Sequence, residues 1–196
     1  MVAGKWKSAS SLLLAALAAV LVLQLRPAPA PASVRDAPAG TTAALREGDL
    51  VFRRGQGLWS GFFAEASAHD RRFSHVGVLI RAGDAWQVVH ASADDRTGIG
   101  GTEAEPLAAF LHDATDFEIR RPRLSTAQLG GFVEALRRAA RTHTPFDTGF
   151  SLATRERVYC TELVWLAWIQ ATGSDPLPRK TLWRGLAVVS IEDVLS

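Results

Sequence analysis

The sequence is poor in several residues that often carry a fold or a function. It has one cysteine, one tyrosine, one methionine and a net charge of only +2 over 196 residues. A single cysteine cannot form a disulfide within the chain, so a disulfide scaffold is excluded. With 47% hydrophobic residues, nine prolines and sixteen glycines, the chain is neither collagen-like nor wholly disordered. These features are typical of one globular domain with a substantial core.

The small excess of positive charge lies in the first 32 residues. Lys5 and Lys7 precede an apolar run at 12–25, and a Pro/Ala stretch with small residues follows. This order is typical of a secretory signal. The run is shorter than the roughly 20 residues that a spanning helix needs, so a signal peptide is favoured and an uncleaved N-terminal membrane anchor is the alternative. No cysteine follows the run, which excludes a lipoprotein anchor.

Without this segment the chain is nearly neutral. Of its 22 basic and 20 acidic residues, three basic ones and no acidic one lie in 1–32, which leaves a net charge of −1. We therefore expect no nucleic-acid partner. Residues 33–44 are rich in Pro and Ala without hydrophobic periodicity and are predicted to be a linker, so the folded domain is expected at 45–196.

The spacing of apolar residues predicts an α+β domain. Two segments rich in Val and Ile flank Arg81-Ala82-Gly83-Asp84, which indicates a β-hairpin with a Gly/Asp turn. The segment 159–172 is apolar on nearly all sides, which is typical of a buried helix. The expected strands are 50–52, 73–80, 85–92, 117–120 and 186–191, the expected helices are 58–68, 106–111, 125–142 and 159–172, and 98–105 is expected to be a glycine-rich loop.

The single cysteine, Cys160, falls in the first turn of that buried helix. Free backbone N–H groups and the helix dipole favour an anion there, which lowers a thiol pKa and stabilises the thiolate. The N–H of Cys160 is also placed to donate to an oxyanion that forms on a substrate carbonyl. The alternative is an inert buried thiol.

A cysteine nucleophile usually needs a histidine base, and the hairpin carries two candidates, His75 and His90. A two-residue turn at Ala82-Gly83 places them directly opposite each other, and a turn at Gly83-Asp84 makes them diagonal neighbours. Both turns leave them on one face of the sheet, whereas a three-residue turn without a bulge separates them. Two adjacent imidazoles allow one to act as base while the other orients it.

Other roles for the histidines stay open. A histidine on a strand is often only structural, and a metal site could use His75, His90 and Cys160, with His69 as a further ligand. No close-spaced pair such as C-x-x-C or H-x-x-x-H supports zinc, so no metal and no cofactor is expected. His69, His112 and His143 lie in polar surroundings and are predicted to be surface residues.

Three segments in order, EGDLVFRRG, SHVGVLIRAGDAWQVVHA and YCTELVWLAW, resemble the permuted branch of NlpC-type cysteine hydrolases, the YiiX/YebB-like proteins. The resemblance covers residues 46–173. It implies a circularly permuted papain-like fold, with a small antiparallel sheet packed on a buried helix that carries the cysteine at its N-terminus. It further implies Cys160 as nucleophile, His75 as base and His90 as the third polar group, a position that is Glu in some members. Glu162 belongs to the matching cysteine motif, and we expect it to complement the helix dipole.

The sequence thus predicts an exported cysteine hydrolase of the periplasm or cell envelope, with catalytic residues Cys160, His75 and His90. Its expected reaction is cleavage of an amide bond in peptidoglycan peptides through a thioester. The lecithin–retinol acyltransferase group is similar in fold and residue order, so an acyl-ester lipid is the alternative substrate, with Trp59, Phe62 and Phe63 as a groove for its acyl chain. A non-catalytic envelope binding module is the second alternative.

Overall fold

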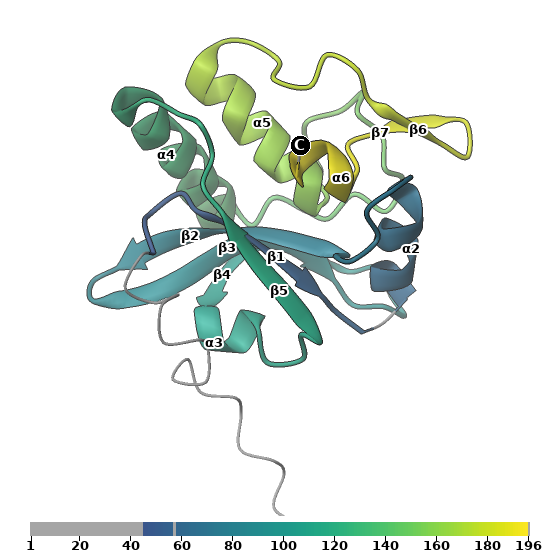
Figure 1. Cartoon of the computed structure of the whole chain (residues 1–196), viewed down its shortest axis with the longest axis horizontal. Helices are drawn as coiled ribbons and strands as arrows, with labels where there is room; N and C mark the ends of the chain where they lie inside the picture. Colours follow the sequence, from purple (N-terminus) through teal and green to yellow (C-terminus); the bar gives the residue numbers. More distant parts are fainter. Residues whose placement is uncertain (1–44, 57, 196) are drawn as a thin grey trace, which may run out of the picture.

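A computed structural model describes residues 45–56 and 58–195 of the chain (Figure 1). The predicted signal segment at 1–32 and the predicted linker at 33–44 lie outside these residues. Within them, no helix has both the length and the apolarity needed to cross a membrane. The elements are β1 (Leu50–Arg54), α2 (Leu58–Ala66), β2 (His75–Ala82), β3 (Ala85–Ala93), β4 (Gly100–Pro106), α3 (Leu107–Phe110), β5 (Asp116–Arg120), α4 (Thr126–Thr142), α5 (Cys160–Thr172), β6 (Thr181–Trp183), β7 (Leu186–Val188) and α6 (Ile191–Leu195).

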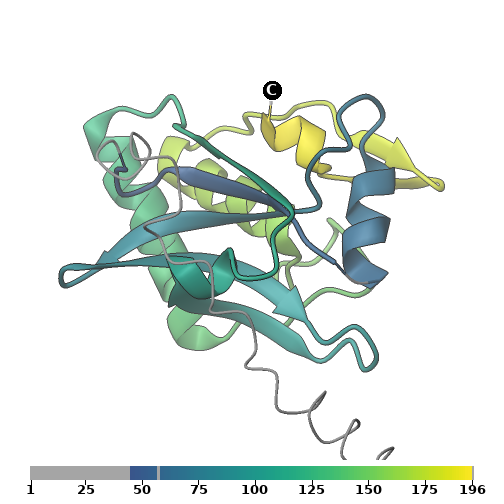
Figure 2. The same ribbon diagram turned by 60° about the horizontal axis from the view of Figure 1, so that its bottom comes forward.

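A five-stranded antiparallel sheet of order β4-β3-β2-β1-β5 forms the centre of the domain. Helices α4 and α5 cover one face, and the short α3 lies on the other (Figures 1 and 2). The predicted α+β class and the helix-on-sheet arrangement are confirmed. The predicted hairpin is also present, since β2 and β3 pair through Ala82↔Ala85 across the turn Gly83-Asp84.

Each face of the sheet buries its own apolar cluster because side chains alternate along a strand. On β2, Val76, Val78 and Ile80 point toward α4 and α5 and belong to the larger cluster. Leu79 points to the opposite face, into a smaller cluster that includes Phe110 of α3. A strand buried on both faces has no polar stripe, which explains why β2 reads as a continuous run of apolar residues.

The two long helices begin and end where the sequence indicates. Ser125 and Gln128 form a capping box at the start of α4: the side chain of each accepts a hydrogen bond from the backbone N–H of the other. Helix α5 ends at Gly173, whose φ of 73° is in the left-handed region that glycine adopts without strain. Helix α5 is buried over most of its first two turns, as its apolar sequence predicts.

Two stretches differ from the prediction. Residues 98–105 are not simply a loop, because most of them form the edge strand β4. Gly100 must be a glycine there, since a Cβ would lie 2.1 Å from the backbone oxygen of Ser92. Strand β4 has few large side chains, so the alternation of buried and exposed residues is not visible in its sequence. The strand is stabilised by its pairing with β3. Thr102 is its buried inward residue and donates through its hydroxyl to the carbonyl of Ala139.

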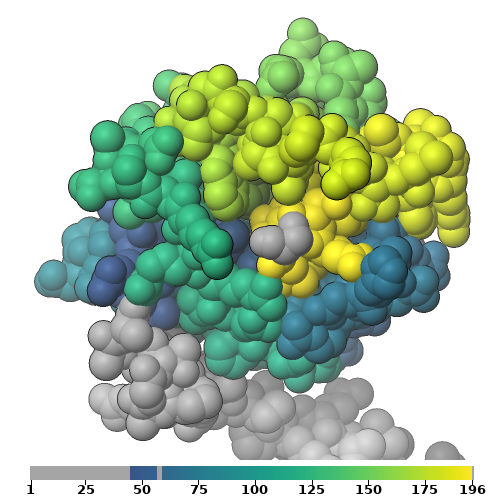
Figure 3. All heavy atoms as spheres, turned by 45° about the horizontal axis from the view of Figure 1, so that its top comes forward, coloured from purple at the N-terminus to yellow at the C-terminus, as the bar shows by residue number. Residues whose placement is uncertain are grey.

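The C-terminal stretch also differs, because the predicted strand 186–191 divides into β7 and the start of α6. Strand β6 was not predicted, and it joins β7 through Arg184-Gly185, both with positive φ, as a tight hairpin requires. Ser190 caps α6 by accepting the N–H of Asp193, a Ser-x-x-Asp signal that is visible in the sequence. Figure 3 shows this C-terminal segment between α5 and the segment that carries α2.

Candidate active site

His75 and His90 are in direct contact. The Nε2 atom of His75 lies 3.0 Å from Nδ1 of His90, and the two rings are nearly perpendicular at 89°. The turn Gly83-Asp84 makes them diagonal neighbours on the sheet, which is one of the two arrangements that the hairpin spacing predicts. The prediction that the two imidazoles share a face is therefore confirmed.

Gly77 and Phe110 shape the space around the His75–His90 pair. Gly77 lies on the same face of β2, and a Cβ there would approach Cγ1 of Val88 to 2.3 Å and Cβ of His90 to 3.2 Å. The absence of a side chain at Gly77 therefore leaves the space in which His90 packs. Phe110 of α3 contacts both imidazoles, with ring centroids 5.5 Å from His75 and 5.1 Å from His90, and fixes their position from outside the sheet.

Burial lowers the pKa of His75 well below its ordinary 6.5, and the neighbouring His90 and the cation of Arg53 lower it further. The imidazole is therefore neutral at neutral pH and carries a lone pair that can accept a proton. A general base needs this state before the reaction begins.

Arg53 is a member of the site that the sequence does not indicate. It pairs with His75 in the β1–β2 register, and its guanidinium lies 4.5 Å over the ring of Phe110 while Nη1 donates to the Phe110 carbonyl at 2.7 Å. Burial lowers its pKa, and the carboxylate of Glu105 opposes that change. Its place beside His75 depends on the pairing of two strands that are 22 residues apart in sequence, which no local motif reveals.

Glu105 is the second unpredicted member. Its Oε1 lies 2.9 Å from Nε2 of His90, and this contact lowers the pKa of the carboxyl group. The spacing Glu-Ala-Glu at 103–105 is a signal that could have revealed it, because alternate residues of a strand share a face. That signal was hidden because this segment was expected to be a loop.

Cys160 is the first residue of α5 and has no exposed surface. Its sulfur receives hydrogen bonds from the backbone of Val76, the residue after His75, and from Thr161 and its own backbone. His75 contacts the ring of Phe110, and among the described residues no hydrogen bond joins its imidazole to the thiol, so Val76 is the link between the two groups in the resting structure.

The expected lowering of the Cys160 pKa is wrong for this resting structure. Burial raises the pKa of the thiol to about 12 and outweighs the backbone hydrogen bonds and the charge of Arg53, which lower it. The helix N-terminus acts as predicted, but the sequence does not reveal how completely the thiol is removed from water. The resting pair is therefore a neutral thiol and a neutral imidazole.

The residues that flank Cys160 hold the start of α5 in place. The N–H of Val189 donates to the Tyr159 hydroxyl at 2.9 Å, and the Thr161 hydroxyl donates to the Val189 carbonyl at 2.6 Å. The backbone N–H and the carbonyl of buried Val189 thus both have hydrogen-bond partners, on the two residues that flank Cys160. This clamp gives the Tyr-Cys-Thr order of the motif a physical reason.

Glu162 lies one turn into α5 and is fully buried. One of its oxygens accepts the Tyr159 N–H at 3.4 Å, which caps the start of the helix. The other has no hydrogen-bond partner among the described residues. Burial raises the pKa of this carboxyl to about 8, so it is mostly protonated at neutral pH, and the expected complement of the helix dipole by a negative charge is wrong there.

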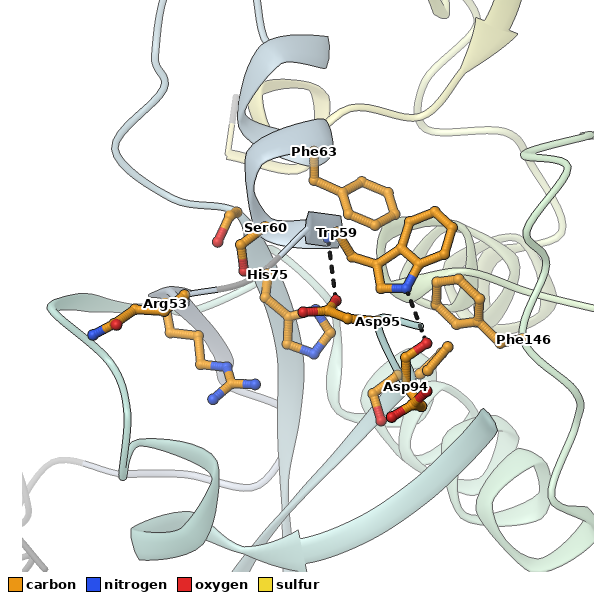
Figure 4. Close-up of a pocket in the computed structure, with 13 residues that line it drawn as sticks. Arg53, Trp59, Ser60, Phe63, His75, Asp94, Asp95 and Phe146 are labelled. Carbon is orange, nitrogen blue, oxygen red and sulfur yellow. Dashed lines mark hydrogen bonds between the residues drawn. The ribbon is translucent and has the colours of Figure 1, made fainter. Parts of the chain in front are cut away.

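A cavity of about 320 Å³ opens beside His75 (Figure 4). One wall is aromatic and most of the rest is polar. Figure 4 shows the rings of Trp59 and Phe63 above His75, with Arg53 on the other side of His75. The aromatic wall is Trp59, Phe63 and Phe146, and the polar lining includes Arg53, Gln56, Ser60, Ser74, Ser92, Asp94 and Asp95. Phe62, expected with Trp59 and Phe63 along a groove, instead stacks on Phe150 with ring centroids 4.3 Å apart.

Trp59 joins α2 to the opposite side of this cavity. Its indole N–H donates to the carbonyl of Asp94 at 3.4 Å, and its backbone N–H donates to Oδ1 of Asp95 at 3.3 Å (Figure 4). These two bonds hold the first turn of α2 against the loop after β3, and they close one side of the cavity.

The remaining histidines lie on the surface, as predicted. His69 is exposed and pairs with Glu192, and His112 and His143 are exposed as well. Over residues 45–56 and 58–195, no group of three or more His, Cys, Asp or Glu side chains is arranged to hold a metal ion.

Comparison with known proteins identifies the family. Residues 44–187 match the family model of the permuted papain-like amidases of the YaeF/YiiX type, the C92 family of peptidases. Among solved structures, the chain is similar to YiiX from Escherichia coli O157:H7, described as a metalloprotein, with a TM-score of 0.60 and 21% identity over 77% of this chain and 92% of that one. No curated protein matches the chain. Since the family model spans most of the chain, this protein belongs to the permuted papain-like amidases and is a cysteine hydrolase.

Proposed function

We propose that this amidase is exported and cleaves an amide bond in cell-wall peptides through a thioester on Cys160. The observation that carries the proposal is the contact of His75 with His90 at the strand end where the sulfur of Cys160 is bound by the backbone of Val76. The catalytic roles follow from this placement and from membership of a papain-like family.

The first half of the reaction forms the thioester. As the sulfur of Cys160 attacks the amide carbon, its proton passes to His75 and the carbonyl electron pair moves to oxygen. The N–H groups at the start of α5 face the developing oxyanion. The tetrahedral intermediate then collapses, the C–N bond breaks, and His75 gives its proton to the departing amine.

In the second half, water releases the acid. His75 accepts a proton from water as its oxygen attacks the thioester carbon, the C–S bond breaks, and the sulfur regains a proton from His75. The raised thiol pKa favours proton transfer that is concerted with attack over a stored thiolate, because the buried anion is strongly disfavoured.

The cavity supports a polar peptide substrate. Its lining combines the Arg53 cation with the carboxylates of Asp94 and Asp95 and with several hydroxyl groups. A site of this polarity suits a substrate with backbone amides and charged ends. The aromatic wall of Trp59, Phe63 and Phe146 favours a second candidate, an acyl-ester lipid whose chain would pack against these rings.

The YiiX structure is described as that of a metalloprotein, but the residues that this structure describes form no group of three or more His, Cys, Asp or Glu side chains that could hold a metal ion. Two ring nitrogens that could bind a metal, Nε2 of His75 and Nδ1 of His90, contact each other at 3.0 Å, so no space is left for an ion between them. No step of the proposed reaction is therefore assigned to a metal.

The proposal of export rests on the basic and apolar pattern of residues 1–32. Expression of the full chain in a bacterium, followed by mass measurement of the protein in the periplasmic fraction, tests it. A protein that has lost the segment supports export, and an uncleaved protein confined to the cytoplasm contradicts it.

The substrate is tested by incubating the full chain with soluble peptidoglycan peptides and, separately, with vesicles that carry acyl-ester lipids. Products are identified by mass spectrometry, and Cys160→Ala is the control. We expect new amine and carboxylate ends in the peptides with the wild-type chain alone. Release of fatty acid from the vesicles without peptide cleavage would support the lipid candidate and overturn the peptide one.

A further inference from the structure

The contacts of His90 give its two ring nitrogens different environments. The side chain is 2% exposed, with Nδ1 facing His75 at 3.0 Å and Nε2 facing the Glu105 carboxylate at 2.9 Å. The Nε2 atom has no well-aligned hydrogen-bond acceptor among the described residues, so its interaction with Glu105 is mainly a close charge contact. One nitrogen therefore meets an imidazole and the other meets a negative charge.

These environments determine where the protons are. A lone pair on Nε2 of His90 would face a carboxylate at 2.9 Å and be repelled, whereas an N–H there is attracted. A neutral imidazole that is protonated at Nε2 has its lone pair at Nδ1. In this neutral form of His90 the lone pair can only accept a hydrogen bond, so the partner atom, Nε2 of His75, carries a proton. Neutral His75 is then left with its lone pair on Nδ1.

We propose that Glu105 is a positioning residue that fixes the tautomers of His90 and His75 and so leaves Nδ1 of His75 as the base for Cys160. The inference rests on the proposed function for the role of His75 in catalysis, but the tautomers themselves are a property of the resting protein. Glu105 contacts His90 and His90 contacts His75, and His75 acts on Cys160 in the proposed reaction. Without Glu105, His90 can donate from Nδ1, which places the His75 lone pair on Nε2 and away from the reaction.

A neighbouring carboxylate, Glu103, does not have the same relation to His90. It lies directly opposite His90 in the strand register, yet its nearest oxygen is 3.7 Å from Nε2. Its side chain is 51% exposed and accepts the Ser92 hydroxyl at 2.7 Å, whereas that of Glu105 is 28% exposed. The geometry assigns the positioning role to Glu105 and makes Glu103 a matched control on the same strand.

The test measures the tautomers directly. The full chain is prepared with ¹⁵N-labelled histidine, and the ring nitrogen shifts are recorded by NMR for wild type, Glu105→Leu, Glu105→Asp and Glu103→Leu. In wild type we expect both His75 and His90 to be protonated at Nε2. Glu105→Leu should change this pattern, Glu105→Asp should restore part of it because it keeps a carboxylate, and Glu103→Leu should leave it unchanged.

A second readout follows from the role of His75. We expect kcat of Glu105→Leu on the peptide substrate to fall about tenfold with little change in KM, a size typical for loss of a group that orients a histidine. Wild-type tautomers retained in Glu105→Leu, or a wild-type His90 without a proton on Nε2, would overturn the inference. If Glu105→Leu fails to fold, the wild-type spectrum still tests the inference, because it shows which ring nitrogens carry protons. A chain with the expected tautomers but no hydrolysis would refute the proposed function and leave the inference about Glu105 standing.

Discussion

Replacing Glu162 by glutamine removes a titration that destabilises the folded protein as the pH rises. The carboxyl is fully buried, and burial raises its pKa from an ordinary 4.5 to about 8. In the folded state it keeps its proton up to about pH 8, whereas in the unfolded state it loses it above 4.5. Because the unfolded state binds fewer protons in this window, the free energy of unfolding falls as the pH rises from 4.5 to 8.

The size of the effect follows from the shift. Each pH unit inside the window lowers the stability by about 1.4 kcal/mol. Between about pH 5.5 and pH 7.5 the loss from this one group is therefore about 3 kcal/mol. Glutamine has almost the same shape and keeps an oxygen that can accept the Tyr159 N–H, so Glu162→Gln is expected to lose this pH dependence without losing the helix cap.

The assay is urea unfolding of both proteins across this range, followed by tryptophan fluorescence. At each pH the difference between the two free energies of unfolding isolates Glu162, because all other groups titrate in both proteins. We expect the variant to gain about 3 kcal/mol relative to wild type between the lower and the higher pH. A difference that stays constant with pH would show that Glu162 ionises normally, and would refute the reasoning from burial.

Three further predictions concern the same site. Tyr159→Phe leaves the buried N–H of Val189 without its acceptor and should lower the free energy of unfolding by about 1–3 kcal/mol, measured by urea unfolding. Arg53→Met removes a cation that lowers the pKa of His75, so an NMR titration of its ring should show a higher pKa, while Arg53→Lys should change it less; an unchanged value would contradict the assignment. Because the pKa of Cys160 is raised to about 12, its alkylation by iodoacetamide in the folded protein should show no inflection near the ordinary thiol value, and one at pH 8–9 would contradict the burial of the thiol.

Local sequence patterns predicted the parts of the site that depend on local geometry. The two-residue turn fixes the parity of the β2–β3 hairpin, so the shared face of His75 and His90 follows from residue numbers alone. The apolar run from Tyr159 places Cys160 at the start of a helix in the same way. These inferences needed only the periods of strand and helix.

The remaining members depend on pairings that are distant in the sequence. Arg53 reaches His75 through the register of β1 with β2, and Glu105 reaches His90 through the pairing of β4 with β3. The wrong direction expected for the Cys160 pKa has a related cause. Local sequence indicates a helix N-terminus, but the burial that outweighs its effect is produced by the packing of the whole domain.

The central claim is that Cys160 accepts the acyl group with His75 as its base. It is tested most directly by mixing the full chain with p-nitrophenyl acetate, quenching with acid within seconds, and measuring the intact mass and the modified peptide. We predict one acetyl group, bound as a thioester to Cys160 in wild type, none in Cys160→Ala, and much slower labelling in His75→Ala. Equal labelling of wild type and Cys160→Ala, or labelling of Cys160 that does not depend on His75, would contradict the account.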